Sequence, residues 1–406
     1  MGVVFMAGTF TAMAQSNTNS PYTRFGLGEL SDRAFTHNAA MGGVGYGLRN
    51  NTQINLMNPA SISAVDSLSF MFDVGMSFKS SNFAEDGIRN NAKNSSFDYL
   101  AMQFRLHPRL GIAVGFTPYS SVGYNFTTTT TNATNTFTGD GGFQQITAGL
   151  GFKILDNLSI GAEVGYLYGS IDYQTLVQPN GTSTDYTVKY QNIKVNSYVA
   201  NFGLQYTQAL TKKDQLTLGL AYGLGHTLNS TNTQGTTRTD YSTETQTNET
   251  SEKDGFSTPH TFGVGLTYTH NQNWTVSADY SLQKWSSAKY NDSKEMYKDI
   301  HKIAAGAEYV PNSLGHSYLK RMRYRVGGYY NTSYLKTATG NGPKEYGISA
   351  GLGLPLFLYQ RNTFLNITGQ YVRVQPSSSA MLSENRFVIK LGLTFNEHWF
   401  MKWKVN

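Results

Sequence analysis

Cysteine is absent from all 406 residues, and charged residues make up only 14% of them. The first absence excludes disulfides, thiolate metal ligands and a lipidated N-terminal cysteine. The charged fraction lies well below the roughly 25% of an ordinary soluble domain. No uninterrupted apolar run of about 18 residues follows the N-terminus, so membrane-spanning helices are not expected. This composition fits neither a cytosolic enzyme nor a disordered protein.

Glycine and aromatic residues are abundant instead, with 41 Gly, 27 Tyr and 23 Phe. Large apolar side chains occupy alternate positions from Leu68 to Phe78, and Ser69, Asp73, Gly75 and Ser77 lie between them. This period of two is typical of a strand with one face in lipid. Strands that span a membrane must close into a barrel, because an open edge leaves backbone groups without partners in lipid. The sequence therefore predicts an all-β fold, a transmembrane antiparallel β-barrel.

The alternating pattern recurs along the chain and predicts about fourteen strands in a barrel domain spanning 67–396. We expect them at 67–79, 96–106, 110–126, 142–154, 158–174, 186–209, 216–229, 259–270, 274–285, 300–310, 321–334, 345–357, 363–374 and 386–396. Residues 397–406 are expected to form a periplasmic tail or the end of the last strand.

Short and long connections alternate between these strands, which is typical of outer-membrane barrels with short periplasmic turns and longer outside loops. Long loops are predicted at 80–95, 127–141, 175–185, 230–258, 286–299, 335–344 and 375–385. An even strand number then places both termini in the periplasm. The connection from Pro311 to Lys320 is long for a periplasmic turn, so it either carries a local feature or marks an error of one strand pair.

The N-terminus is predicted to be a signal peptide, residues 1–14. A short apolar stretch ends in Ala12-Met13-Ala14, the pattern that signal peptidase accepts before Gln15. No Lys or Arg precedes the apolar stretch, and the alternative is a short buried N-terminal element. Export of this kind, together with a barrel, predicts the outer membrane of a Gram-negative bacterium.

A barrel of this size is wider than its own side chains can fill, because roughly eight strands fill themselves. Residues 15–66 precede the first strand, and we interpret them as a plug, or hatch, inside the lumen. Small inward residues such as Gly111, Gly161 and Gly219 leave room for such a layer. By the same alternation, charged residues face inward and are expected to pair within the wall or with the plug. These are Asp73, Glu163, Asp279, Glu308, Arg323, Arg325, Arg386 and Lys390.

The plug ends in Asn58-Pro59-Ala60, just before the first strand, and contains SPYTRFGLGEL and AAMGGVGYGLRN. In these features the chain resembles the OmpP1/FadL/TodX long-chain fatty acid transporter family, in the form found in Bacteroidetes. The resemblance implies an outer-membrane channel that passes hydrophobic molecules through a plugged lumen. It also implies sideways release at a kinked third strand, where this chain has Pro118 followed by Gly123. The alternative is that Pro118 only marks a strand end above the membrane.

A fatty acid would be one hydrophobic ligand of such a lumen, beside the lipid around the barrel. Its carboxylate needs a cation, and the candidates are Arg323, Arg325 and Lys390. The alternative is that these cations neutralise Glu163, Asp279, Glu308 or the plug. A second functional hypothesis is a non-transporting subunit or scaffold of an outer-membrane protein assembly or secretion complex, which the C-terminal extension and long loops would favour.

No enzyme, cofactor, metal or nucleic-acid partner is expected. Gly347 to Gly351 match G-x-S-x-G, but the match lies inside an alternating strand rather than at a strand-turn-helix junction. The 8 His are scattered without ligand spacing. The formal net charge is +6, and the basic residues form one tight cluster, from Lys320 to Arg325. The cluster alternates as residues of a strand do, so it is not interpreted as a nucleic-acid-binding patch.

Overall fold

The computed structural model describes residues 18–398 except 68, 86–87, 182–184, 240–244, 292, 294–296, 338–339, 357–362 and 379–380. The predicted signal peptide lies outside the described residues, as does nearly all of the predicted tail. Within the described part, no helix combines the length and the apolar character that crossing a membrane requires.

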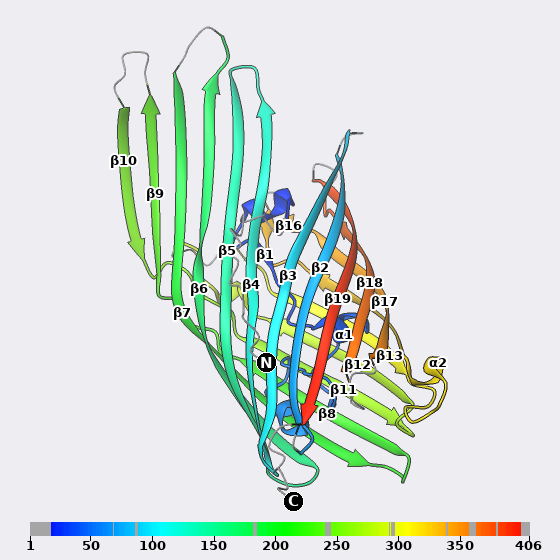
Figure 1. The fold of residues 1–406 in the computed structure, drawn as a ribbon. Helices are drawn as coiled ribbons and strands as arrows, with labels where there is room; N and C mark the ends of the chain where they lie inside the picture. Colours follow the sequence, from blue (N-terminus) through cyan, green and yellow to red (C-terminus); the bar gives the residue numbers. More distant parts are fainter. Residues whose placement is uncertain are drawn as a thin grey trace, which may run out of the picture.

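Fourteen antiparallel strands form a closed barrel, which confirms the predicted fold (Figure 1). The first and last of them, β2 and β19, pair with each other and close the ring. The strands are β2 (Ser69–Glu85), β3 (Ile88–His107), β4 (Leu110–Thr129), β5 (Ala133–Lys153), β6 (Leu158–Pro179), β7 (Tyr186–Ala209), β8 (Asp214–Gly223), β11 (Thr261–His270), β12 (Trp274–Gln283), β13 (Ile300–Tyr309), β14 (Arg323–Thr332), β17 (Lys344–Leu356), β18 (Thr363–Gln375) and β19 (Ser383–His398).

The two faces of the wall differ as the alternation predicts. On β5, Ile146 and Leu150 point outward and are 46% and 48% exposed, whereas Gln145 and Thr147 are buried. Alternate side chains of a strand lie on opposite faces, so the apolar set forms an outer band suited to lipid. The polar set faces the lumen.

Several predicted loops are strands. β4 to β7 rise above the barrel as one sheet, joined by the hairpin of β9 (Ser230–Thr239) and β10 (Thr245–Lys253) (Figure 1). β9 pairs with the upper half of β7, whose lower half pairs with β8. We call this the extended sheet; it comprises residues 117–129, 133–145, 167–179 and 186–197 with β9 and β10.

The prediction that 80–95, 127–141, 175–185 and 230–258 are loops is therefore wrong for most of their residues. β9 and β10 carry no large apolar side chain, yet both are strands. Thr-rich sequence is compatible with this because β-branched residues favour strands.

The other connections contain short elements. η3 (Trp285–Ser287) begins just before the predicted 286–299 loop, and a small hairpin of β15 (Lys336–Thr337) and β16 (Gly340–Asn341) lies within 335–344. The unusually long connection after Pro311 carries the helix α2 (Tyr318–Arg321). It is a local feature, and the strand count is unaffected.

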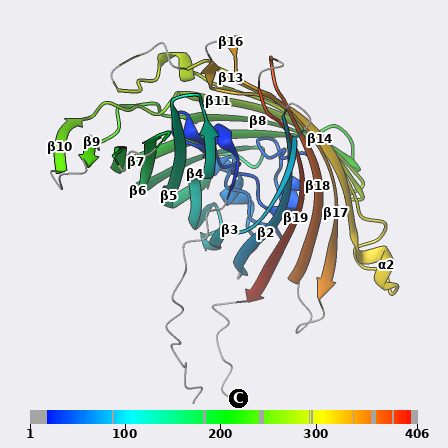
Figure 2. The same ribbon diagram turned by 90° about the horizontal axis from the view of Figure 1, so that it is seen from above.

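Residues 18–66 lie within the ring of strands, as the view from above shows (Figure 2). This N-terminal segment contains η1 (Pro21–Arg24), β1 (Glu29–Leu30), α1 (Thr36–Ala39) and η2 (Pro59–Ala64). Inward glycines give it room, because a Cβ at Gly111, Gly161 or Gly219 would overlap its backbone. Thr368 donates to the Thr36 carbonyl at 2.8 Å, and Gln103 donates to the Ile62 carbonyl at 3.1 Å.

Candidate functional site

The Asn58-Pro59-Ala60 motif joins the N-terminal segment to the wall. Asn58 is fully buried and caps η2 by accepting from the Ala60 N–H at 3.0 Å. Its amide donates to the carbonyls of Leu204 on β7 and Leu220 on β8, both at 3.2 Å. Pro59 lies against Gly161, where a Cβ would overlap its backbone. One side chain thus satisfies a helix end and fixes it to two strands.

Buried carboxylates of the wall form a second set of contacts between segment and wall. Arg33 of the segment lies 2.6 Å from Glu163 on β6. Asp279 on β12 accepts from the N–H groups of Gly45 and Tyr46 at 2.6 and 2.9 Å. These inward charges have partners of the kind that burial requires.

The three predicted carboxylate partners separate into two groups. Arg323 and Arg325 bind Glu308 at 3.0 and 2.7 Å. Arg325 also donates to Gln53 of the N-terminal segment at 3.1 Å. These two cations therefore fit the alternative interpretation, in which they neutralise the wall. Lys390 instead lines a cavity.

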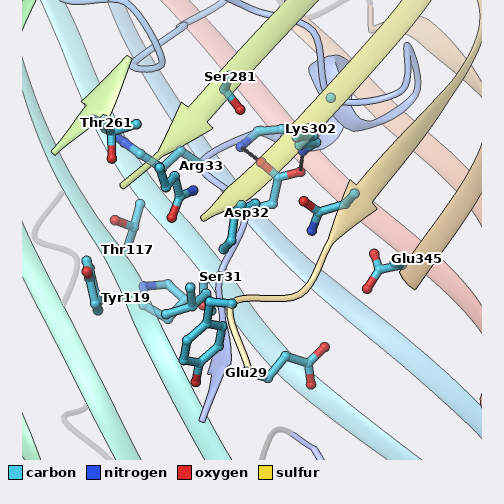
Figure 3. Close-up of a pocket in the computed structure, with 18 of the residues that line it drawn as sticks. Glu29, Ser31, Asp32, Arg33, Thr117, Tyr119, Thr261, Ser281, Lys302 and Glu345 are labelled. Atoms are coloured by element: carbon cyan, nitrogen blue, oxygen red, sulfur yellow. Dashed lines mark hydrogen bonds and ion pairs between the residues drawn. The ribbon is translucent and has the colours of Figure 1, made fainter. Parts of the chain in front are cut away.

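That cavity, of about 480 Å³, lies between the N-terminal segment and the wall (Figure 3). Its apolar lining includes Leu30, Phe35, Pro118, Tyr119 and Val388. Its charged lining carries both signs and includes Glu29, Asp32, Lys79, Lys302, Glu345, Arg386 and Lys390. The lining therefore has the mixed character that suits a molecule with an apolar body and a polar end.

Most of these charges are paired across the cavity. Figure 3 shows Lys302 of β13 against Asp32, and their atoms are 2.6 Å apart. Burial raises the pKa of Asp32, but Lys302, Lys390 and the Ala34 N–H together outweigh this effect, and the pKa falls below its usual value. Arg386 and Lys79 hold Glu29 at 2.6 and 3.2 Å. They likewise lower the pKa of Glu29 well below its usual range, against the effect of burial.

Beside this cavity the wall has a seam. β3 and β4 pair only from His107 opposite Leu110 to Leu100 opposite Phe116. Beyond Leu100 the two strands continue without pairing to each other, and Figure 1 shows their upper parts diverging. The next three residues of β4 after Phe116 all line the cavity: Thr117, Pro118 and Tyr119. The cavity thus reaches the wall where β3 stops pairing with β4.

β4 continues through Pro118 to Thr129, so the interpretation of Pro118 as a strand end is wrong. The register with β5 shifts between Pro118 and Ser120, which leaves Tyr119 as the extra residue of a β-bulge. Proline cannot donate to a ladder and is tolerated at such irregularities.

The N-terminal segment covers β4 above the seam. Glu29 and Leu30 pair with Ser121 and Ser120, and the Ser31 N–H donates to the Tyr119 carbonyl at 2.9 Å. Further up, the Thr23 hydroxyl lies 3.3 Å from both the N–H and the carbonyl of Gly123. The segment thus takes the ladder positions on β4 that β3 leaves open.

An aromatic cluster lies over the N-terminal segment. Its residues come from the connections that follow β12 and β14. Trp285 is fully buried and packs against Tyr334 with ring centroids 4.8 Å apart. The Tyr334 hydroxyl accepts from the Leu27 N–H at 3.1 Å and donates to the Gly28 carbonyl at 2.5 Å. The same core includes Leu27 and residues of the extended sheet such as Ile193. These contacts tie β1 to the loops as well as to β4.

Sequence reasoning missed Lys302, Lys79, Glu29 and Asp32 as cavity residues. Lys302 was within its reach, because it shares an inward face with Glu308 by alternation along β13. Glu29 and Asp32 gave no signal, since the N-terminal segment has no strand period.

Comparison with known proteins places the fold. A Pseudomonas aeruginosa FadL homologue is 13% identical, with a TM-score of 0.65, and covers 90% of this chain and 99% of its own. The Ralstonia pickettii toluene transporter TbuX is 15% identical over 89% of this chain and 98% of its own, with a TM-score of 0.62. The Pseudomonas putida toluene transporter TodX is 14% identical over 92% of this chain and 100% of its own, with a TM-score of 0.62. No curated protein matches.

The fold is therefore that of a FadL-type outer-membrane barrel. The family model BamG matches residues 1–406, the whole chain. The chain belongs to the BamG family. Its assignment to Bacteroidetes stays a prediction.

Proposed function

We propose that this protein is an outer-membrane channel for hydrophobic small molecules, which diffuse through the lumen past the N-terminal segment without covalent chemistry. The segment acts as a plug, the short turns and both termini lie in the periplasm, and the extended sheet lies outside the cell. Support comes from the fold shared with a FadL homologue and two toluene transporters.

One observation carries the proposal: the cavity reaches Thr117, Pro118 and Tyr119, where β3 stops pairing with β4. A passenger leaving there would enter the bilayer sideways rather than cross to the periplasm. Only two residues of β1 pair with β4 at this point. Because so short a ladder involves few hydrogen bonds, β1 can separate from β4 without breaking the pairing of any two barrel strands, once the ion pairs of Glu29 with Arg386 and Lys79 are released.

The passenger we propose is a long-chain fatty acid or a similar amphipathic molecule. Its apolar part would contact Leu30, Pro118 and Tyr119, and its carboxylate would bind Lys390. Lys390 is the one of the three predicted cations that lines the cavity. Burying a carboxylate requires such a partner.

A disulfide across β1 and β4 tests the seam. The natural chain has no Cys, so Leu30→Cys with Ser120→Cys introduces a single possible crosslink between directly opposed residues. Oxidation should abolish uptake of a fluorescent long-chain fatty acid by cells or proteoliposomes, and reduction should restore it. Thr127→Cys with Thr136→Cys provides the matched control, because this pair joins β4 to β5 away from the seam. Equal uptake by both oxidised proteins would refute sideways release.

The second candidate is a subunit or scaffold of an outer-membrane protein assembly or secretion complex. Membership of the BamG family favours it. Mild-detergent purification followed by mass spectrometry separates the candidates. A channel should carry bound lipid or fatty acid, whereas a subunit should bring partner proteins in fixed stoichiometry.

A further inference from the structure

The inner face of the extended sheet carries a hollow of about 880 Å³, distinct from the lumen cavity. This face is the one that holds the buried Ile193 lower down on β7, two residues from Gln191. Cross-strand partners share a face, so the pairing register shows which side chains meet there. One row of partners runs across the sheet through Tyr124, Tyr173, Gln191, Gln234 and Thr250. The row above it runs through Thr175, Lys189, Thr236 and Asn248.

One end of the hollow is aromatic. Tyr124 lies over Gly139, where a Cβ would overlap its ring, and its ring centroid is 6.3 Å from that of Tyr173. Next to them, the Arg24 guanidinium lies 3.8 Å from the centroid of the Phe137 ring. Because Tyr173 is only half-buried, part of this aromatic surface remains open to a ligand.

The other end is polar and has hydrogen-bonding capacity to spare. Within the described part of the chain, the side chains of Gln234, Thr236, Asn248 and Thr250 have no protein hydrogen-bond partner. Amides and hydroxyls both donate and accept. Gln191, between the two ends, donates to Asn232 at 3.0 Å.

This combination selects the ligand class. An apolar molecule would displace the water that binds these amides and hydroxyls. It would offer no hydrogen bonds in place of those lost, which is unfavourable. A polyanion would need many cations, and among the described residues that line the hollow the only cations are Arg24 and Lys189. A sugar ring, in contrast, offers an apolar face to aromatic side chains and hydroxyls that both donate and accept.

We propose that the hollow of the extended sheet is a carbohydrate-binding site. A sugar ring stacks on the open part of Tyr173, which buried Tyr124 supports from beside it, and the hydroxyls of that ring and its neighbours bind Gln234, Thr236, Asn248 and Thr250. The carbohydrate is either a free oligosaccharide or the sugar portion of a lipopolysaccharide on the same membrane.

The test uses the full chain purified in a detergent without a sugar headgroup. The first arm measures binding of free oligosaccharide fragments of α-1,4-glucan, β-1,4-glucan, α-mannan and polygalacturonate. The second arm uses purified lipopolysaccharide and the polysaccharide released from it by mild acid. Binding in the first arm alone assigns a free oligosaccharide, and binding in the second alone assigns the lipopolysaccharide.

Paired variants locate the binding on the inner face. Gln234→Ala with Thr250→Ala should weaken binding at least tenfold. Thr233→Ala with Ser251→Ala should leave it unchanged, because these opposed residues lie one position along the same strands and face the other way. Retained heat-modifiable migration of each variant shows that the barrel is folded. Absence of binding in both arms, or equal binding by the two double variants, overturns the proposal.

Discussion

Leu30 of β1 lies opposite Ser120 of β4. A strand of the N-terminal segment therefore pairs with β4 just above the point where β3 stops pairing with it. The wall is therefore completed at this point by a part of the chain that is not itself a barrel strand. Such a replacement differs from an ordinary β-bulge, which changes the register but leaves the same neighbours in contact. The predictions below ask what this replacement and its supporting contacts do.

Deletion of Tyr119 removes the extra residue of the β4 bulge and restores a continuous register with β5. We expect uptake of a fluorescent fatty acid to fall, because the bulge places Pro118 and Tyr119 in the cavity lining. Heat-modifiable migration should remain, since the ladder is regularised rather than broken. Full uptake by a folded deletion protein would show that the bulge is not needed for passage.

Replacing Asn58 by Ala should loosen the N-terminal segment. The change removes a helix cap and leaves the buried carbonyls of Leu204 and Leu220 without this donor. The expected loss is about 2 to 3 kcal/mol, seen as faster proteolysis within residues 18–66. Asn51→Ala is the matched control, because Asn51 is exposed and, among the described residues, its side chain bonds only to Asp66. Similar proteolysis of both variants would contradict the role of Asn58.

Lys390 and Arg325 should respond differently to substitution by Gln. Lys390→Gln should reduce fatty acid uptake but not toluene uptake, because toluene has no carboxylate to bind. Arg325→Gln leaves Glu308 with one partner fewer inside the barrel and should lower the free energy of unfolding by about 3 kcal/mol. Loss of fatty acid and toluene uptake to the same extent in Lys390→Gln would remove the proposed carboxylate contact.

Acid should release the N-terminal segment through His37 of α1. Burial, together with the nearby Arg325, lowers the pKa of His37 to about 3, against about 6.5 in an unfolded chain. The contribution of neutral, buried His37 to the free energy of unfolding is complete above pH 6.5 and is lost as the pH falls towards 3. At pH 4.5 the loss is about 2 to 3 kcal/mol.

Hydrogen exchange of residues 18–66 at pH 7 and 4.5, corrected for intrinsic rates, measures this loss. His37→Gln should show a smaller acid response than the natural chain. Glu29 and Asp32 stay ionised in this range because their pKa values lie below the usual ones. An identical response of the two proteins would assign the acid effect to other groups.

The barrel was predictable because lipid imposes one repeated pattern on every strand. Ile146 and Leu150 show it plainly, and the turn between β3 and β4 lies at Pro108 and Arg109, between the strands predicted at 96–106 and 110–126. β9 and β10 were missed for the complementary reason: they rise beyond the apolar band, so no alternation of large apolar residues marks them. Polar strands and polar loops look alike when only hydrophobicity is considered.

The candidate site was predictable only in part. Alternation placed Lys390, Glu308 and Arg325 inside the lumen, yet it could not say which of them would pair. That outcome depends on the path of the N-terminal segment, which has no period and is fixed by single contacts such as Arg33 with Glu163. The seam depends on where β3 and β4 diverge, and local sequence encodes only the bulge at Pro118.

The contacts of the N-terminal segment also govern the order of folding. Ser20 donates to Glu384, Thr36 accepts from Thr368, and Glu29 binds Arg386, at sequence separations of 364, 332 and 357 residues. The part of the barrel chain that is synthesised first therefore acquires these partners only after the last strands exist. Such non-local contacts slow folding, because the entropy of closing a long loop is lost before any contact compensates for it. The segment can therefore make these contacts only once β18 and β19 have completed the wall around it.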